Sequence, residues 1–295
     1  MVQSLATAYH LAKLAVLGAL VTVAPQGGRE LPPIISGRQD MLPVVSRVDA
    51  PAGTEALGVQ WVSVAVPGLG VMLAAVARPE GVGPFPALLI LHGSHGFASQ
   101  YVKLAQSIAR GGVLGVAACW FKGGRGAGSR FITPIACPEA PPIADASSPA
   151  ALRAVNALVQ AVRHLPDVRS DRVALFGHSR GGGASLNYVL PGATAVRAVV
   201  LNSAGYPAEL ATRVTAINVP FLMLHGVTNS PADGGSAFSS VQMARDFEAA
   251  LRRAGKRVEA AYYQEGGHNS LFTTETQYDD EVRRITAFLR RYLFD

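Results

Sequence analysis

Short apolar runs alternate with helical patterns along most of this 295-residue chain. Six runs are almost continuously apolar, which is typical of strands covered on both faces and therefore of a parallel sheet. These runs occupy residues 87–93, 112–120, 172–179, 196–204, 220–226 and 257–264. Apolar residues at helical spacing predict helices between them, at residues 99–112, 148–166, 236–256 and 276–294.

A strand pair precedes these units. VQWVSVAVPG (59–68) and VMLAAVARP (71–79) are strand-like and are joined by a turn that contains Gly, which predicts an antiparallel hairpin. The whole pattern predicts an α/β fold with a mostly parallel central sheet, helices on both faces and an N-terminal antiparallel hairpin. In such sheets the chemistry gathers at the carboxyl ends of the strands.

The first 56 residues differ from the rest. Residues 25–56 are rich in Pro and Gly and predict an irregular arm, so that a single α/β domain fills residues 57–295. The apolar stretch 14–24 is too short to span a bilayer as a helix. It fits the apolar part of a signal peptide over residues 1–24, or else a frayed amphipathic segment. A cytoplasmic and an exported protein both stay open.

Composition narrows the classes of partner. Hydrophobic residues make up 49% of the chain, which is enough for a sizeable core without a partner chain. The net charge of +6 comes from scattered basic residues, whereas a nucleic-acid surface would need a dense basic cluster. We therefore expect no nucleic acid and no stable membrane span. Cys119 and Cys137 lack metal-ligand spacing and either form one disulfide or stay free thiols. The oligomeric state stays open.

The pentapeptide GHSRG (177–181) ends one apolar run and opens a helical pattern. This is the G-x-S-x-G pattern, in which a sharp strand-to-helix turn lifts the serine oxygen out of the sheet and the glycines avoid clashes. The alternative is a structural tight turn without chemistry. In this strand–turn–helix context, the pattern predicts that Ser179 is a nucleophile.

A serine hydroxyl needs a base within hydrogen-bond reach, and imidazole suits that task near neutral pH. Of the seven histidines, His268 has the right order and place, in a Gly-flanked loop between the last strand and the last helix. We interpret the others as local hydrogen-bonding or capping residues. His92 and His95 lack an apparent third ligand, so we expect no metal.

Two further segments follow strand ends. In HGSHG (92–96), the backbone N–H of Ser94 can point at a developing oxyanion, and the N–H of Arg180 would supply the second donor. An ordinary turn is the alternative. The long segment 120–148 is predicted to be a loop beside the site. Its Trp120 and Phe121 either line a substrate pocket or only pack the loop.

Four motifs in order, LHGSHG, GHSRGG, FLMLHG and GGHNS, make the chain resemble the α/β-hydrolase superfamily over roughly residues 58–294. Within it, the chain looks most like the dienelactone-hydrolase-like branch with a serine nucleophile. Dienelactone hydrolases themselves use a cysteine, so a dienelactone substrate is not expected. The resemblance implies a serine esterase with a Ser–His–acid triad, an acyl-enzyme, a small-molecule carboxylic ester as substrate, and no cofactor.

Two alternatives to an esterase remain. An acyltransferase or a small peptidase would use the same acyl-enzyme with another acceptor or leaving group. A non-catalytic ligand-binding protein of the same fold is the second alternative, and the identity of the acid keeps it open. In the resembling proteins the acid commonly stands three residues after the Gly of HG, where this chain has Asn229. An amide there stabilises an imidazolium less well than a carboxylate does. We therefore expect Asp233, four residues on, to be the acid, with Asn229 as the alternative position and a turn or helix cap as the alternative role of Asp233.

Overall fold

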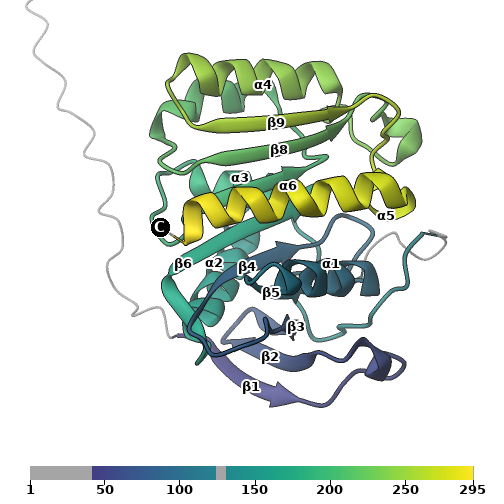
Figure 1. Ribbon diagram of the computed structural model, residues 1–295, viewed down its shortest axis with the longest axis vertical. Helices are drawn as coiled ribbons and strands as arrows, with labels where there is room; N and C mark the ends of the chain where they lie inside the picture. Colours follow the sequence, from purple (N-terminus) through teal and green to yellow (C-terminus); the bar gives the residue numbers. More distant parts are fainter. Residues whose placement is uncertain (1–41, 124–130, 295) are drawn as a thin grey trace, which may run out of the picture. The chain divides into compact units, whose positions relative to one another are not determined.

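The computed structural model describes residues 42–123 and 131–294, which form a nine-stranded sheet flanked by helices (Figure 1). The strand order is β1-β2-β3-β5-β4-β6-β7-β8-β9. The pairs from β1 to β5 along this order are antiparallel, and those from β5 to β9 are parallel. The strands are β1 (Val44–Val48), β2 (Gln60–Val66), β3 (Gly70–Ala77), β4 (Phe85–Leu91), β5 (Leu114–Ala118), β6 (Val168–His178), β7 (Ala198–Asn202), β8 (Phe221–Gly226) and β9 (Val258–Tyr263).

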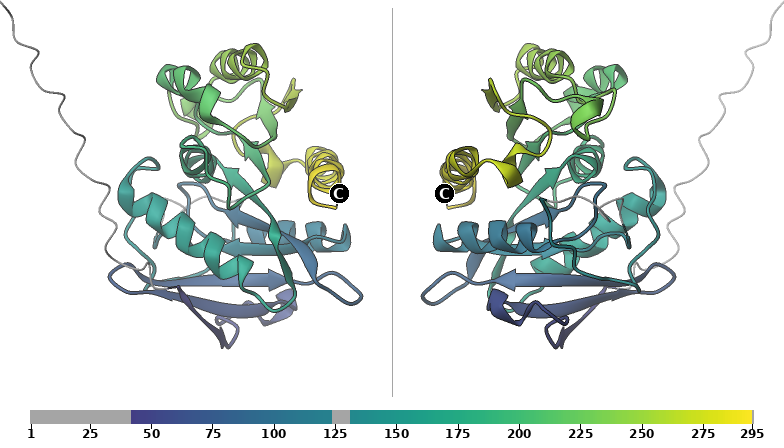
Figure 2. Two further views of the ribbon diagram at one scale, coloured as in Figure 1. Left: turned by 90° about the vertical axis from the view of Figure 1, so that its left-hand side faces the viewer. Right: turned by 90° about the vertical axis from the view of Figure 1, so that its right-hand side faces the viewer.

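Helices cover both faces of the sheet, as the side views in Figure 2 show. One apolar cluster joins the sheet to α1 and α6, and a second joins the opposite face to α2, α3 and α4. The helices are α1 (Ser99–Arg110), α2 (Pro149–Arg163), α3 (Arg180–Val189), α4 (Val241–Arg253), α5 (Ser270–Thr273) and α6 (Glu275–Leu293). The short 3-10 helices are η1 (Glu55–Leu57), η2 (Ala208–Ala216) and η3 (Pro231–Asp233). The predicted α/β architecture is thus confirmed, including the β2–β3 hairpin.

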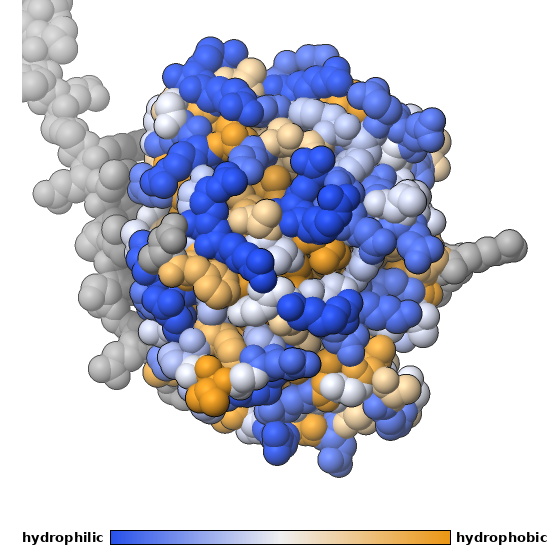
Figure 3. Space-filling view, in the orientation of Figure 1, coloured by the Kyte–Doolittle hydropathy of each residue, from blue (hydrophilic) through white to orange (hydrophobic). Residues whose placement is uncertain are grey.

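Helix α6 shows how the pattern maps onto the layers. Its buried side is mostly apolar and includes Ile285, Phe288 and Leu289, while Arg283 and Arg284 are exposed. The outer face of the molecule over α6 is accordingly mainly hydrophilic (Figure 3). An amphipathic helix of this kind gains its stability from burying one stripe against the sheet.

The structure also adds features that the sequence pattern did not predict. Residues 44–48 form β1, an edge strand paired with β2, where an irregular arm was expected. The segment is short and its exposure does not alternate cleanly, so period-two patterning gives little signal. Helix α4 begins at Val241 because the Ser240 side chain caps it, later than the predicted start at 236.

Three of the sequence-based expectations concern segment 1–24, membrane-spanning helices and the two cysteines. The signal-like segment 1–24 lies outside the described residues. Within the described ranges, none of the helices combines the length and the apolar character that crossing a membrane requires. Cys119 and Cys137 are joined by a disulfide, which ties the end of β5 to the following loop.

Candidate active site

Ser179 occupies a strained turn between β6 and α3. Its backbone has φ 51° and ψ −116°, a conformation that non-glycine residues rarely adopt and that functional sites often retain. The close packing depends on glycine: a Cβ on Gly177 would collide with the main chain of Gly181, and one on Gly181 would collide with the main chain of Leu91. The main-chain N–H of Ser179 donates to the carbonyl of Asn202 at 2.9 Å. This geometry matches the strand–turn–helix expected from the sequence.

His268 lies against this turn from the loop between β9 and α5. Its Nε2 is 2.9 Å from Ser179 Oγ, and its side chain is buried. A close main-chain contact places the loop, since a Cβ on Gly226 at the end of β8 would collide with Gly266. The structure therefore brings together the serine and the histidine that the sequence singled out, although 89 positions separate them.

The other ring nitrogen of His268 faces an amide. Asn229 Oδ1 lies 3.1 Å from His268 Nδ1, and Asn229 is 5% exposed. Asp233 instead binds the main chain, because its Oδ2 accepts from the N–H of His268. No hydrogen bond between Asp233 and the imidazole ring occurs in the described residues. The expected contact between the Asp233 carboxylate and the ring is therefore not the one the structure has. Asp233 lies in η3, where its main chain and side chain shape the loop.

The side chains around Asn229 include several hydrogen-bond donors. His225 Nε2 lies 2.9 Å from the carbonyl oxygen of Ser239, which requires a hydrogen on that nitrogen. The same Nε2 lies 3.4 Å from Asn229 Nδ2, so one donor faces another. Ser239 Oγ lies 3.3 Å from Asn229 Oδ1. Together with His268 Nδ1, these groups would suit a carboxylate at position 229 at least as well as they suit the amide.

Burial keeps the histidines of this region neutral. Desolvation is the largest cause in each case, and it lowers the pKa of these side chains from 6.5 to values between about 2 and about 4. The five are His92, His95, His178, His225 and His268. For His268 the value is about 3, with His178 and His225 as further causes. A neutral His268 can accept a proton, but the resulting imidazolium has only an amide beside it.

The segments expected to supply oxyanion donors lie next to Ser179. Arg180 is the first residue of α3, so its N–H has no acceptor within the helix. The Arg180 side chain donates from Nε to Ser94 Oγ at 3.1 Å and from Nη1 to the Ala144 carbonyl at 2.7 Å. A Cβ on Gly93 would lie 3.2 Å from the Cβ of Ser179. The HGSHG turn thus packs directly against the serine.

Two aromatic residues after β5 pack behind this turn. Trp120 and Phe121 are almost fully buried, and Trp120 Nε1 donates to the His92 carbonyl at 2.9 Å. The Phe121 ring lies 4.4 Å from the His92 ring. Their other sides line a hollow of about 200 Å³ together with residues of the 141–144 segment and α2. Trp120 and Phe121 therefore both pack behind the HGSHG turn and line this hollow.

A larger cavity, of about 340 Å³, lies elsewhere. Its lining includes Arg47, Arg78, Leu114 and Asp167. Leu114 begins β5 and Asp167 immediately precedes β6, so this cavity lies at the amino ends of the parallel strands, away from Ser179. In residues 42–123 and 131–294 there is also no cluster of three or more His, Cys, Asp or Glu arranged to hold a metal ion.

Several polar residues near the site were not anticipated. Tyr101 OH accepts from the Gly93 N–H at 2.9 Å and lies 2.6 Å from His95 Nε2. Asn202 and Asn269 contact the two ring nitrogens of His178. Asn269 sits inside the GGHNS motif, but nothing in its sequence position indicates that its partner is the residue before Ser179.

The fold and the arrangement of Ser179, His268 and the neighbouring turns define an α/β-hydrolase. The dienelactone hydrolase family matches residues 72–292, most of the chain, and the chain belongs to this family. It is accordingly a hydrolase. No curated protein sequence matches it.

Solved structures show the same fold at low sequence identity. A dienelactone hydrolase from Anabaena variabilis is 18% identical, with a TM-score of 0.57 over 85% of this chain and 99% of that one. An esterase from Pyrococcus furiosus is 13% identical, with a TM-score of 0.63 over 84% of this chain and 98% of that one. Dipeptidyl peptidase 4 from Porphyromonas gingivalis is 16% identical, with a TM-score of 0.58 over 80% of this chain and 35% of that one.

Proposed function

We propose that this hydrolase cleaves carboxylic esters of small molecules through a serine nucleophile. The observation that carries the proposal is the 2.9 Å contact between Ser179 Oγ, in its strained turn, and Nε2 of a neutral His268. A base in this place accepts the hydroxyl proton as the oxygen attacks the ester carbonyl. The family and the esterase neighbour support the same class of reaction.

The reaction proceeds in two halves. Ser179 Oγ bonds to the carbonyl carbon, and His268 passes the proton to the departing alkoxide, which leaves as an alcohol. Water then loses a proton to His268 and attacks the acyl-enzyme. His268 returns this proton to Ser179 Oγ as the carboxylic acid leaves, which restores the free serine and the neutral histidine. The main-chain N–H groups of Ser94 and Arg180 stabilise the oxyanion in both halves.

Asn229, rather than Asp233, orients the base in this proposal. The 3.1 Å contact from Asn229 Oδ1 to His268 Nδ1 supports it, because it holds the hydrogen on Nδ1 and leaves Nε2 free to accept from Ser179. Asp233 supports the loop through the His268 main chain. The amide adds no negative charge, so the reaction should be slower than in a carboxylate triad.

The test compares purified wild-type protein with Ser179→Ala on p-nitrophenyl esters of graded acyl length and with a fluorophosphonate probe. The matched control is Ser170→Ala, at an exposed position. We expect turnover and labelling in wild type and Ser170→Ala, and neither above background in Ser179→Ala. If folded Ser179→Ala turned over esters at the wild-type rate, the proposal would be wrong.

The same assay separates the alternatives. A wild-type protein that neither labels nor hydrolyses any ester would support a non-catalytic ligand-binding protein. Adding alcohol acceptors detects an acyltransferase through transfer products, and p-nitroanilide substrates detect a peptidase. Each of these would use the acyl-enzyme that the probe reports.

A further inference from the structure

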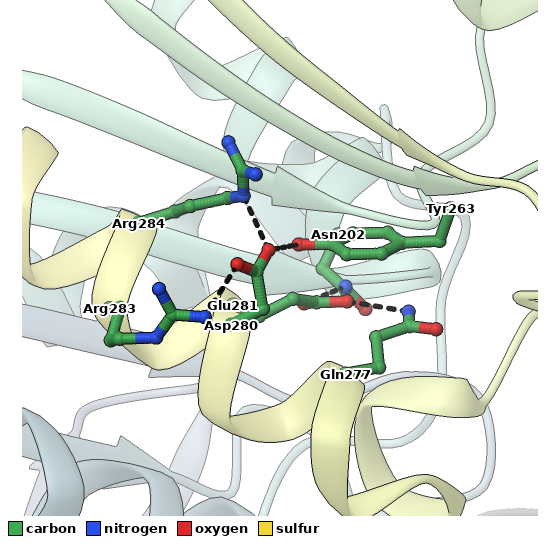
Figure 4. A network of polar contacts seen from close by, with 7 residues as sticks. All are labelled: Asn202, Tyr263, Gln277, Asp280, Glu281, Arg283 and Arg284. Atoms are coloured by element: carbon green, nitrogen blue, oxygen red, sulfur yellow. Dashed lines mark hydrogen bonds and ion pairs between the residues drawn. The ribbon is translucent and has the colours of Figure 1, made fainter.

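A buried carboxyl group lies behind the site and takes no part in the proposed ester cleavage. Glu281 of α6 is fully buried. Its neighbour Asp280 forms the nearby ion pairs, with Arg283 and Arg284 at the surface (Figure 4). Glu281 instead meets two amides: Gln277 Nε2 lies 2.8 Å from Oε1, and Asn202 Nδ2 lies 2.6 Å from Oε2. A buried carboxylate with only neutral partners is costly.

The Asn202 amide connects Glu281 to His178, the residue before the nucleophile. Asn202 Oδ1 lies 2.6 Å from His178 Nδ1, and the main-chain carbonyl of Asn202 accepts from the Ser179 N–H. His178 Nε2 lies 3.3 Å from Asn269 Oδ1. Asn269 directly follows His268. A chain of hydrogen bonds therefore runs from α6 to both sides of the candidate active site.

The position of each hydrogen in this series of hydrogen bonds can be worked out from its last member, Asn269. Asn269 Nδ2 donates to the Asp233 carbonyl, which leaves its Oδ1 facing His178 Nε2. An amide oxygen only accepts, so His178 Nε2 must carry a hydrogen. If the ring is neutral, Nδ1 is bare and needs a donor from Asn202. This exchanges the amide oxygen and nitrogen of Asn202 relative to the placement given above: the NH₂ faces His178, and the oxygen faces Glu281 and needs a donor.

We propose that Glu281 is a positioning residue that is protonated in the resting protein and donates a hydrogen bond to Asn202. Asn202 then holds His178 as its Nε2–H tautomer. His178 in turn anchors Asn269, the residue next to His268. In the opposite orientation, with Nδ2 toward Glu281 and Oδ1 toward His178, a neutral His178 carries its hydrogen on Nδ1, and Nε2 has none to give to Asn269 Oδ1. Exchanging the two ends of an amide is a choice that the hydrogen-bond network decides. The network favours the exchanged arrangement, because in it every one of these contacts pairs a donor with an acceptor.

Electrostatics supports this arrangement. Burial raises the pKa of Glu281 to about 8, and burial lowers the pKa of His178 to about 4. The hydrogen bonds from Gln277 and Asn202 lower the Glu281 pKa, Asp280 raises it and Arg284 lowers it, but burial is the largest cause. Tyr263 of β9 also faces this region, and burial together with Glu281 and Asp280 raises its own pKa well above the usual range. At pH 7 both Glu281 and His178 are then neutral.

The proposal predicts that kcat falls at alkaline pH, which gives the pH profile an alkaline limb. This prediction rests on the proposed esterase function. Above about pH 8 Glu281 ionises and can no longer donate. Asn202 must then turn, the hydrogen on His178 moves to Nδ1, and the bond to Asn269 is lost. Loss of one such bond should lower kcat roughly three- to tenfold with little change in KM.

The experiment uses the full chain and three proteins: wild type, Glu281→Gln, and Glu275→Gln as the control on the exposed start of α6. Glutamine can donate to Asn202 and accept from Gln277 at any pH. We expect Glu281→Gln to match wild type at pH 7 and to lack the alkaline limb, which Glu275→Gln keeps. Identical alkaline limbs in all three proteins, or a more than tenfold loss for Glu281→Gln at pH 7, would overturn the proposal.

Infrared spectroscopy provides a measurement that does not depend on activity. We expect a protonated-carboxyl C=O band at pH 6.5 in wild type and Glu275→Gln that is missing in Glu281→Gln and disappears from wild type above about pH 8. Identical spectra in this region would overturn the protonation whatever the turnover. If the wild type hydrolyses no ester, the proposed function fails and the positioning role fails with it, while the band still decides the state of Glu281.

Discussion

Replacing Asn229 by aspartate should make this enzyme faster. The substitution keeps the shape of the side chain and puts a carboxylate oxygen where Oδ1 now lies, 3.1 Å from His268 Nδ1. His225 Nε2–H, which now faces the amide NH₂, gains an acceptor, and Ser239 Oγ is also within reach. The donors around position 229 would thus offset much of the cost of burying the new charge.

The size of the gain follows from the charge that forms on His268 in the transition state. Two unit charges about 4 Å apart interact by about 4 kcal/mol at an effective dielectric constant of about 20. That energy corresponds to about a 10³-fold change in rate, and in a well-studied triad the reverse change, Asp to Asn, costs about 10⁴-fold. After a residual desolvation cost, we expect kcat of Asn229→Asp to rise by about 10²- to 10³-fold.

The assay measures kcat and KM on one p-nitrophenyl ester between pH 4 and pH 9. The gain should fall in kcat, because the new charge acts on the transition state more than on substrate binding. The pH below which kcat falls should also rise. In wild type, burial lowers the His268 pKa to about 3, and a carboxylate beside the ring favours its protonated form.

Asp233→Asn is the paired variant. Its side-chain oxygen can still accept from the His268 N–H, so we expect less than a tenfold loss of kcat. The opposite result would refute this reasoning: a loss of several orders of magnitude in Asp233→Asn, together with no gain in Asn229→Asp, would show that Asp233 is the acid.

Three further predictions concern the oxyanion donors, pH and the disulfide. Ser94→Pro removes one N–H donor and should lower kcat by on the order of 10²–10³-fold, whereas Ser94→Ala keeps the N–H and should lose far less; equal losses would contradict a main-chain role. The five histidines with lowered pKa are neutral in the folded protein but protonate near pH 6.5 in the unfolded chain. As the pH is lowered from 6.5 towards 4, the free energy of unfolding should therefore decrease, by up to about 1.4 kcal/mol per pH unit for each histidine. Urea titrations that give a constant free energy of unfolding from pH 7 to pH 4.5 would count against burial of neutral rings. The disulfide between Cys119 and Cys137 closes a loop with a sequence separation of 18, and reducing it should lower the free energy of unfolding by about 3 kcal/mol. The measurement compares urea unfolding with and without reductant. The double variant Cys119→Ser/Cys137→Ser is the control and should not respond to reductant.

The hydrophobic pattern alone determined most of the architecture. Continuous apolar runs such as 87–93 and 220–226 are typical of strands in a sheet covered on both faces, so they predicted β4 and β8 and the helical layers that cover them. The G-x-S-x-G pentapeptide likewise predicted the strand–turn–helix around Ser179, because few other residues tolerate its crowded turn. These features depend on local periodicity and sterics, which a sequence displays directly.

Only the tertiary structure decided which groups meet across the site. Asn229 and Asp233 lie four positions apart in one loop, and their order gives no sign of which side chain turns to His268 Nδ1 and which binds the main chain. The Cys119–Cys137 bond and the pairing of β1 with β2 depend in the same way on where distant segments come together.

The buried polar network belongs to the same class, although the sequence carried a weak signal for it. Gln277 and Glu281 stand four residues apart on the stripe of α6 that also holds Ile285 and Leu289, so helical spacing could have marked them as buried. Their partner Asn202 comes from another strand. Whether a buried carboxyl group is charged depends on that partner and on the exclusion of water, and both exist only once the helix is packed on the sheet.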